Sequence, residues 1–230
     1  MLQARLDGVP VRAEPGMKDA ICPCCGTEVV AKCGQMVVWH FAHKASNECD
    51  RWSDGETDWH LRWKTHSPIE RTEVIMGPHR ADAVGRDGRI IEYQRSSISW
   101  EDMRAREEFY GRMMWVFDVA DAYQAGRLSW QTDRSIWQQA DNVGHPKVRI
   151  KWMHPRRSIL ACRRRVFLDI GGDRLLAVGH LAREYIDWSA AEPGRTIKLP
   201  YLSGYGWLWK RDEFIEEFLA DVVEHEEVPA

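Results

Sequence analysis

The sequence has no long hydrophobic run, and this absence excludes one class of protein. No stretch of the 230 residues approaches the roughly 20 apolar residues that a membrane-spanning helix needs. The N-terminal segment MLQARLDGVPVRAEPG contains charges and prolines but no apolar stretch, so we do not expect a secretory signal. These observations predict a cytoplasmic protein without a membrane partner.

The sequence also lacks an excess of charge of either sign. The 32 Lys and Arg residues oppose 35 Asp and Glu residues, which gives a formal net charge of -3. Because such a balance does not favour nucleic acid over the whole surface, any basic surface must be local and offset elsewhere. The hydrophobic content of 44% excludes disorder of the whole chain and predicts a buried core.

Cysteine is scarce outside one segment. Of the 6 cysteines, Cys162 lies alone, and the others fall close together at Cys22, Cys24, Cys25, Cys33 and Cys49. A secreted disulfide framework usually distributes its cysteines, whereas a cluster interleaved with histidines favours a metal site in a reducing compartment. Cys22 and Cys25 form a C-x-x-C pair followed by glycine, which is typical of a turn that presents two sulfurs to one ion.

A tetrahedral zinc site needs two further ligands. We predict a structural Zn²⁺ bound by Cys22, Cys25, His43 and Cys49. Because the second pair has no standard spacing, three alternative ligands remain open, namely His40, Cys24 and Cys33. The alternative interpretation is a set of buried free thiols and core histidines. The metal would fold a segment too small to hold itself together.

Hydrophobic periodicity and turn residues predict an ordered set of elements in the middle of the chain. The expected order is a helix, three strands, a second helix and a fourth strand, at 56–66, 69–76, 79–84, 89–94, 100–112 and 113–119. Two hairpin turns are expected at Asp87-Gly88 and Gly171-Gly172. We predict three domains: a zinc module at 1–50, a core at 51–145, and an extension at 146–230 with a basic stretch and a final acidic helix.

Acidic residues recur along these expected elements. Glu56, His60 and Lys64 are spaced to line one face of the first helix. Further carboxyl groups fall on the three strands, at Glu73 (or Glu70), Asp82 and Glu92, and Gln94 follows Glu92 by two residues. If the Asp87-Gly88 turn pairs the second and third strands, Asp82, Glu92 and Gln94 point to one side.

Converging carboxylates are the ligands that Mg²⁺ or Mn²⁺ prefers, and such an ion polarises a phosphodiester and activates water. A single acid is more often a solvated charge or half of an ion pair. The combination of Asp82 and Glu92 across a turn, beside Gln94, favours a metal site.

The strings CPCCG, HFAHK, GETDWHLRWK, HRADAV and IEYQRSSIS, followed by Arg106–Tyr110, resemble the CoiA-like competence-protein family of the PD-(D/E)xK nucleases. The resemblance runs from about Cys22 to Tyr110. It implies a restriction-endonuclease-like core, a mixed sheet flanked by helices. We therefore predict an α/β fold in which a small N-terminal zinc module precedes this core and a β-containing extension follows it.

The resemblance also implies roles for individual residues. Asp82 and Glu92 correspond to the magnesium ligands, and Glu56 belongs to the first helix of the site. Gln94 stands where the family usually has a lysine, which orients the attacking water and stabilises charge on the phosphate. Glutamine orients water but carries no charge. Lys64 either supplies the missing cation from the first helix or is a solvent-facing or phosphate-contacting lysine. His60 is either a proton carrier or a hydrogen-bonded structural histidine.

A basic stretch from Lys147 to Arg165 contains no acid. It predicts either contact with a phosphate backbone or a solvated basic face of a strand pair, and both interpretations stay open. The residues that we expect to contact DNA are Lys64, Arg80, Arg95, Ser96, Ser97, Arg163, Arg164 and Arg165.

The carboxylate pattern predicts metal-dependent phosphodiester cleavage. The resemblance implies that the substrate is DNA and that the protein is a deoxyribonuclease acting in DNA uptake, recombination or phage-related DNA metabolism. Its expected catalytic residues are Glu56, Lys64, Glu73, Asp82, Glu92 and Gln94. The expected partners are DNA, single- or double-stranded, and a recombination or phage-related protein. The alternative is a zinc-containing DNA-binding or recombination accessory protein with weak catalysis.

Overall fold

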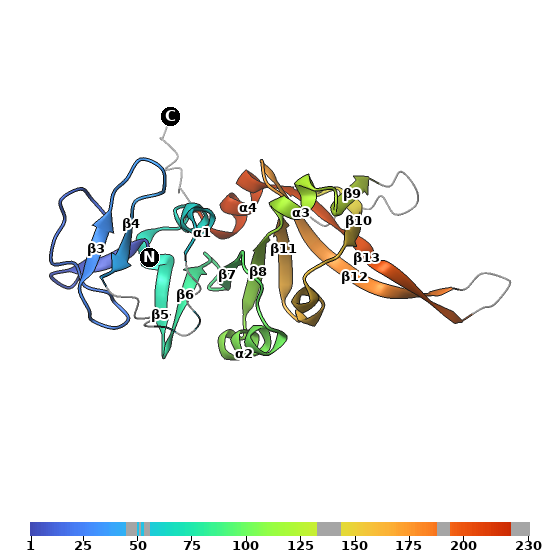
Figure 1. Cartoon of the computed structure of the whole chain (residues 1–230), viewed down its shortest axis with the longest axis horizontal. Coiled ribbons are helices and arrows are strands. Elements are labelled where there is room, and N and C mark those ends of the chain that lie inside the picture. Colours follow the sequence, from blue (N-terminus) through green and yellow to red (C-terminus); the bar gives the residue numbers. More distant parts are fainter. Residues whose placement is uncertain (45–49, 51, 53–55, 133–143, 188–193, 222–230) are drawn as a thin grey trace, which may run out of the picture. The chain divides into compact units, whose positions relative to one another are not determined.

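A computed structural model describes residues 1–44, 50, 52, 56–132, 144–187 and 194–221 (Figure 1). The chain forms two compact units. The first comprises Met1–Glu92 together with the described part of Glu213–Ala230, and the second comprises Tyr93–Asp212.

The N-terminal part of the first unit consists of two small hairpins. β1 (Gln3–Leu6) pairs with β2 (Val9–Arg12), and β3 (Val29–Lys32) pairs with β4 (His40–His43). Asp7 and Gly8 join β1 to β2 with φ angles of 52° and 82°, the conformation of a type I′ turn. Residues 3–12 therefore form a tight antiparallel hairpin. The hairpins share a small core of Met1, Ala4, Ala13, Ala20, Cys22, Val29 and Phe41.

The rest of the first unit contains helix α1 (Asp58–Lys64), the short 3-10 helix η1 (Ile69–Arg71) and three antiparallel strands. The strands are β5 (Thr72–Met76), β6 (His79–Val84) and β7 (Ile90–Gln94), of which β7 continues into the second unit. α1 begins two residues later than expected because Thr57 caps it, accepting a hydrogen bond from the backbone N–H of His60. Most of α4 (Arg211–Phe218) belongs to this unit, and the ring of Phe214 packs against Trp63.

The turn predicted between β6 and β7 is confirmed. Gly88 has a φ of 77°, and the N–H of Gly85 donates to the carbonyl of Arg89 at 2.8 Å. This turn sets the register that pairs Ala83 with Ile91.

The second unit contains a mixed sheet with helices. Its elements are α2 (Trp100–Tyr110), β8 (Met113–Asp118), α3 (Ala120–Gln124), β9 (Leu128–Thr132), β10 (Lys147–Met153), the 3-10 helix η2 (Arg157–Ala161), β11 (Arg165–Asp169), β12 (Arg174–Asp187) and β13 (Arg195–Lys210). The strand order is β8-β11-β12-β13-β10-β9, in which β8 and β11 are parallel and the other pairs are antiparallel. Every residue of β8 is buried, as its apolar run predicts.

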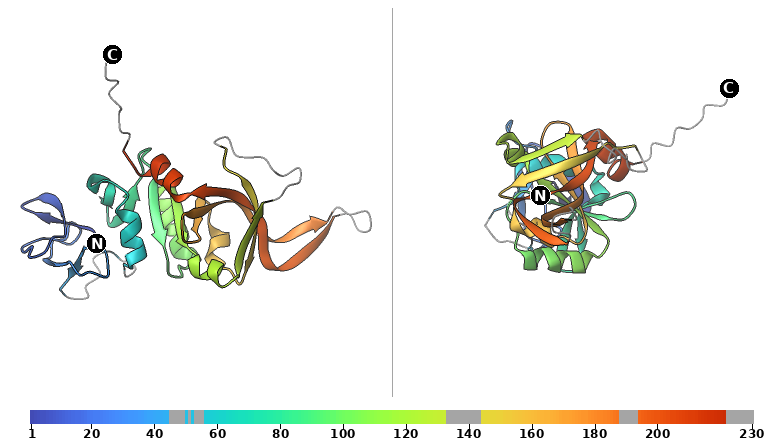
Figure 2. Two further views of the ribbon diagram at one scale, coloured as in Figure 1. Left: turned by 90° about the horizontal axis from the view of Figure 1, so that it is seen from above. Right: turned by 90° about the vertical axis from the view of Figure 1, so that its right-hand side faces the viewer.

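Local signals placed several of these elements correctly. Ser99 caps α2 by accepting from the N–H of Asp102, and Gly171 and Gly172 both have positive φ angles in the β11–β12 turn. β12 and β13 form a long two-stranded ribbon (Figures 1 and 2).

The structure confirms a mixed α/β protein and the expected order of helix, three strands, helix and strand. The restriction-endonuclease-like assignment and the domain boundaries near residues 50 and 145 stay predictions. The predicted final helix spans Arg211–Phe218, and residues beyond 221 lie outside the described part of the chain. Among the described residues, no helix combines the length and apolar character that crossing a membrane requires.

Candidate functional site

Three of the predicted zinc ligands lie together in the first unit. The Sγ atoms of Cys22 and Cys25 and a ring nitrogen of His43 all lie within 4.8 Å of one another. A tight turn presents the two sulfurs: the N–H of Gly26 donates to the carbonyl of Cys22 at 2.9 Å, and Gly26 has a φ of 70°. His43 reaches the same place from the end of β4.

The chemistry of these side chains fits Zn²⁺. The Sγ of Cys25 lies 3.0 Å from Thr27 Oγ1 and 3.4 Å from His43 Nε2. Partial burial acts to raise the pKa of Cys25, but hydrogen bonds with Thr27, His43 and Cys22 lower it to about 6. A thiol with this pKa is largely a thiolate at neutral pH, which is the form that binds zinc.

The structure separates the alternative ligands from this cluster. Cys24 and Cys33 pack against the small apolar core, and the Nδ1 of His40 lies 2.9 Å from the carbonyl oxygen of Val38. The described cluster of metal-binding type therefore contains Cys22, Cys25 and His43. The fourth predicted ligand, Cys49, lies outside the described residues.

The predicted carboxylates form a row across three strands. In the β5–β6 register, Thr72 pairs with Ala83 and Val74 with Ala81, so Glu73 stands opposite Asp82. In the β6–β7 register, Asp82 in turn stands opposite Glu92, and its N–H donates to Glu92 Oε1 at 3.3 Å. Glu73, Asp82 and Glu92 therefore occupy neighbouring positions on three adjacent strands.

Lys64, the last residue of α1, reaches into this row. Its Nζ lies 2.8 Å from Asp82 Oδ1 and 3.2 Å from Glu73 Oε1, and it also forms an ion pair with Glu56. The residue is 1% exposed. Burial acts to lower the pKa of Lys64, but Asp82, Glu56 and Glu73 raise it well above its ordinary value. The ammonium group is therefore charged and faces carboxylates, not solvent.

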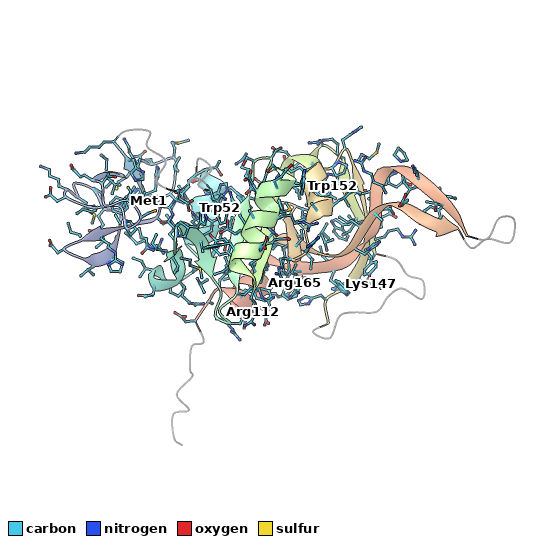
Figure 3. All side chains as sticks on the ribbon, turned by 90° about the horizontal axis from the view of Figure 1, so that it is seen from below. Met1, Trp52, Arg112, Lys147, Trp152 and Arg165 are labelled. Atoms are coloured by element: carbon cyan, nitrogen blue, oxygen red, sulfur yellow. The ribbon has the colours of Figure 1, made fainter. Side chains whose placement is uncertain are left out.

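Glu56 lies just before α1 and not on the helix as expected. It nevertheless forms an ion pair with Lys64. Its other carboxylate oxygen pairs with the N-terminal amine of Met1, which is labelled in Figure 3. Burial acts to raise the pKa of Glu56, but Lys64 and the amine of Met1 hold it well below its usual range. Glu56 is thus an ionised, buried partner of Lys64.

Glu73 has its carboxylate occupied by the protein itself. Its Oε2 accepts hydrogen bonds from the N–H groups of Leu2 at 2.9 Å and Gln3 at 3.1 Å, while Oε1 faces Lys64. The residue is 1% exposed and has a φ of 52°, a backbone conformation that is costly for a residue with a side chain. The hydrogen bonds from Leu2, Gln3 and Lys64 to the Glu73 carboxylate stabilise this positive-φ backbone conformation.

Gln94 and His60 make local hydrogen bonds. Gln94 Nε2 donates to the carbonyl of Ser96 at 3.1 Å and to its Oγ at 2.9 Å, and Gln94 is 2% exposed. It shares β7 with Glu92 and lies two residues further along. His60 Nδ1 lies 2.9 Å from Thr57 Oγ1 within the capping box of α1, which supports the structural interpretation of this histidine.

The donor set of Asp82 and Glu92 fits a hard cation. Both side chains are carboxylates on adjacent strands. The side chain of Asp82 is 20% exposed, its Oδ1 lies 2.8 Å from Lys64 Nζ, and Glu92 is buried. Mg²⁺ is usually held by one or two carboxylates and keeps several waters, so two protein ligands suffice.

The residues expected to contact DNA lie in different surroundings. Ser96, Ser97 and Arg163, Arg164 and Arg165 are exposed, and the side chain of Arg95 is 45% exposed with its Nε 3.4 Å from Asp118. The backbone N–H groups of Arg163 and Arg164 donate to the buried carboxylate of Glu107 at 3.0 and 3.2 Å. Arg80 is half-buried, and Lys64 is buried as described above.

Sequence reasoning gave no role to Asp50, another buried acid of the first unit. Its carboxylate accepts from the N–H groups of Trp52 and Arg80 at 2.9 and 2.8 Å and lies 3.0 Å from His79 Nδ1. Burial acts to raise the pKa of Asp50, but these bonds lower it. Asp50 therefore contacts the start of β6 through His79 and Arg80. No local pattern in the sequence marks such a role.

Comparison with known proteins matches one part of the chain. Residues 17–51 match the family model described as Competence protein CoiA, N-terminal domain. No curated protein and no solved structure matches the chain. The matched segment contains the Cys22, Cys25 and His43 cluster. This segment of the chain is therefore similar to the N-terminal domain of the competence protein CoiA.

Proposed function

We propose that this protein is a divalent-metal-dependent deoxyribonuclease of the PD-(D/E)xK type with a role in competence-related DNA metabolism. One observation carries the proposal: Asp82 and Glu92 stand opposite each other on adjacent strands, with Lys64 Nζ 2.8 Å from Asp82. The CoiA N-terminal domain supports the competence-related role.

In this proposal Asp82 and Glu92 hold Mg²⁺ or Mn²⁺. A bound ion of this kind polarises the phosphodiester and lowers the pKa of a bound water. Gln94, two residues beyond Glu92 on β7, would orient the attacking water through its side-chain amide. Its bonds to Ser96 fix the orientation of that amide.

Lys64, Glu56 and Glu73 act as positioning residues in this proposal. Because Lys64 is 1% exposed, we assign its charge to holding Asp82 in place and offsetting the carboxylates, not to direct contact with DNA. Glu73 and Glu56 in turn hold Lys64 between them. The carboxylate of Glu73 also receives two backbone N–H groups, so we exclude it from the proposed metal ligands.

The test is a nuclease assay on single-stranded and duplex DNA with Mg²⁺ or Mn²⁺. Asp82→Asn and Glu92→Gln should each reduce cleavage by about 100-fold or more, the usual loss when a group that stabilises transition-state charge is removed. The exposed acids Asp212→Asn and Glu108→Gln serve as matched controls and should cut like wild type. Circular dichroism and thermal melting must show that each variant folds.

An accessory role is the second candidate, and a specific observation favours it. Gln94 carries no charge, and the charge of Lys64 is already engaged by three carboxylates. A protein that binds DNA, never cuts it with either metal, and behaves identically after Asp82→Asn would be a DNA-binding or recombination accessory protein.

A further inference from the structure

One face of the sheet in the second unit gathers basic side chains. Along β10 the side chains alternate: Val148, Ile150 and Trp152 are buried, whereas Arg149 and Lys151 are exposed and Lys147 is half-buried. Figure 3 labels Lys147 and Trp152, near the two ends of this strand. Because residues two apart on a strand point to the same side, three cations follow one another at about 6.7 Å intervals.

Aromatic side chains lie beside these cations. In the β10–β13 register Lys147 pairs with Trp207, Arg149 with Tyr205, and Met153 with Tyr201, so the rings occupy the same face. Lys147 Nζ lies 4.4 Å from the centre of the Tyr205 ring, and Lys151 Nζ lies 4.5 Å from that of Tyr201. Tyr205 is 37% exposed.

Gly179 in β12 leaves space for the rings of Tyr205 and Trp207. The register of β12 and β13 shifts between Val178 and His180, at Gly179. A Cβ at Gly179 would lie 2.5 Å from Cε2 of Tyr205 and 2.8 Å from Cζ3 of Trp207. The rings of Tyr205 and Trp207 therefore pack directly against the β12 backbone at Gly179.

The charge of this face is of one sign. The residues of 129–131, 147–153 and 201–207 include no Asp or Glu. On β9 the positions paired with Arg149 and Lys151 are Gln131 and Ser129, which are polar and uncharged. A local positive surface therefore exists on a chain whose formal net charge is -3.

We propose that this basic aromatic face, formed by Lys147, Arg149, Lys151, Tyr201, Tyr205 and Trp207, binds single-stranded DNA. The cations follow the phosphates, and unstacked bases stack on the tyrosine rings. Single strands fit better than a duplex because a duplex buries the faces of its bases in its own stack. The choice of DNA rests on the proposed function; the single-stranded preference and the location of the surface go beyond it.

Fluorescence anisotropy with a labelled oligothymidylate tests the proposal. The buffer contains neither Mg²⁺ nor Mn²⁺, so that no cleavage occurs, and no chelator, so that zinc is retained. Tyr201→Ala/Tyr205→Ala should weaken binding by about tenfold or more, because it removes the rings on which the bases stack. Tyr201→Phe/Tyr205→Phe keeps both rings and should bind like wild type.

Lys147→Gln/Lys151→Gln should reduce the salt dependence of binding. For single strands each phosphate contact contributes about 0.7 to the slope of log K against log salt, so this variant should lose about 1.4. The matched controls are Tyr123→Ala, since Tyr123 is 38% exposed on α3, and Lys18→Gln/Lys32→Gln, which removes two exposed lysines elsewhere. Both controls should keep wild-type affinity and slope.

Three results would overturn the proposal. In the first, the folded tyrosine variant binds the oligothymidylate as tightly as Tyr123→Ala does. In the second, the protein binds a duplex of equal length as tightly as the single strand. In the third, it binds an RNA more tightly than the DNA. The outcome is separable from that of the nuclease assay. If the tyrosine variant binds like wild type and wild type cuts DNA, the binding surface alone is refuted. If the tyrosine variant loses binding but wild type never cuts DNA, the nuclease alone is refuted.

Discussion

Lys64 is the residue on which the buried carboxylates of the first unit depend. It pairs with Glu56, Glu73 and Asp82 while it is 1% exposed. Burying charges is costly, and the arrangement persists because each charge faces an opposite one. The raised pKa of Lys64 means that its contribution to stability is lost only at alkaline pH, as pH rises through the folded value.

We predict that Lys64→Met lowers the free energy of unfolding by about 3–5 kcal/mol at pH 7.5, because it leaves buried carboxylates without their cation. The unpaired carboxylates then have raised pKa values in the folded state and take up protons as the pH falls. Stability lost at pH 7.5 should therefore be partly regained at pH 5.5. Urea unfolding at the two pH values measures this difference.

Wild type should not gain stability between pH 7.5 and pH 5.5. The pKa of Glu56 lies well below its ordinary value, so its contribution is present above the unfolded carboxyl pKa of about 4.3 and is lost as pH falls toward the folded value. The exposed control Lys32→Met should follow wild type at both pH values. An equal loss for Lys64→Met at pH 7.5 and 5.5 would show that its effect is packing, not charge.

At the scale of elements, the N-terminal hairpins depend on a short turn and one strand end. Cys22 and Cys25 come from the turn before β3, and His43 is the last residue of β4. The core that supports them is small, with Phe41 and Met1 as its largest members. A bound metal ion would therefore contribute a large part of the folding free energy of this segment.

We predict that the purified protein contains one zinc ion and that Cys25→Ser loses it. Loss of a structural zinc should lower the melting temperature and unfold the hairpins, because the ligands no longer hold the turn to β4. Elemental analysis gives the zinc content, and limited proteolysis followed by mass spectrometry locates the opened segment.

Cys33→Ser is the matched control for the zinc prediction. Cys33 is a half-buried cysteine of the same segment that packs against the core and lies outside the metal cluster. It should retain zinc. A Cys25→Ser protein with a full zinc content would show that Cys25 is not a ligand.

At the scale of the whole molecule, charge sets the behaviour in solution. The sequence pI is about 6.3, and the formal net charge at pH 7 is -3. Proteins associate most readily where their net charge is near zero. We predict a solubility minimum near pH 6.3 at low salt, which a precipitation series from pH 5 to 8 measures. A minimum more than about one pH unit away would mean that bound metal or shifted pKa values dominate the net charge.

Much of the local structure follows from the sequence for a physical reason. The turns at Gly88 and at Gly171-Gly172 need positive φ angles that glycine adopts freely, and Ser99 supplies an oxygen for the free N–H groups of α2. The C-x-x-C pair predicts two zinc ligands because both sulfurs lie within one turn. Such features depend on residues that are close in the chain.

Other features needed the tertiary structure. Glu73 receives N–H groups from Leu2 and Gln3, some 70 residues away, and these backbone groups leave no pattern in the sequence. The Lys64 charge was expected to serve a phosphate, yet burial turns it toward carboxylates. Burial and long-range partners decide what a charged side chain faces, and both are consequences of the fold.

By itself, the sequence determined the order of the central elements, the turns between them and the two cysteines of the C-x-x-C pair, because these depend on neighbours in the chain. Only the tertiary structure decided which side chains meet across strands. It placed Lys64 among the carboxylates and set Tyr205 beside Lys147, two residues that are joined only through the pairing of β10 with β13. Strand register brings distant residues together, and no local periodicity specifies it.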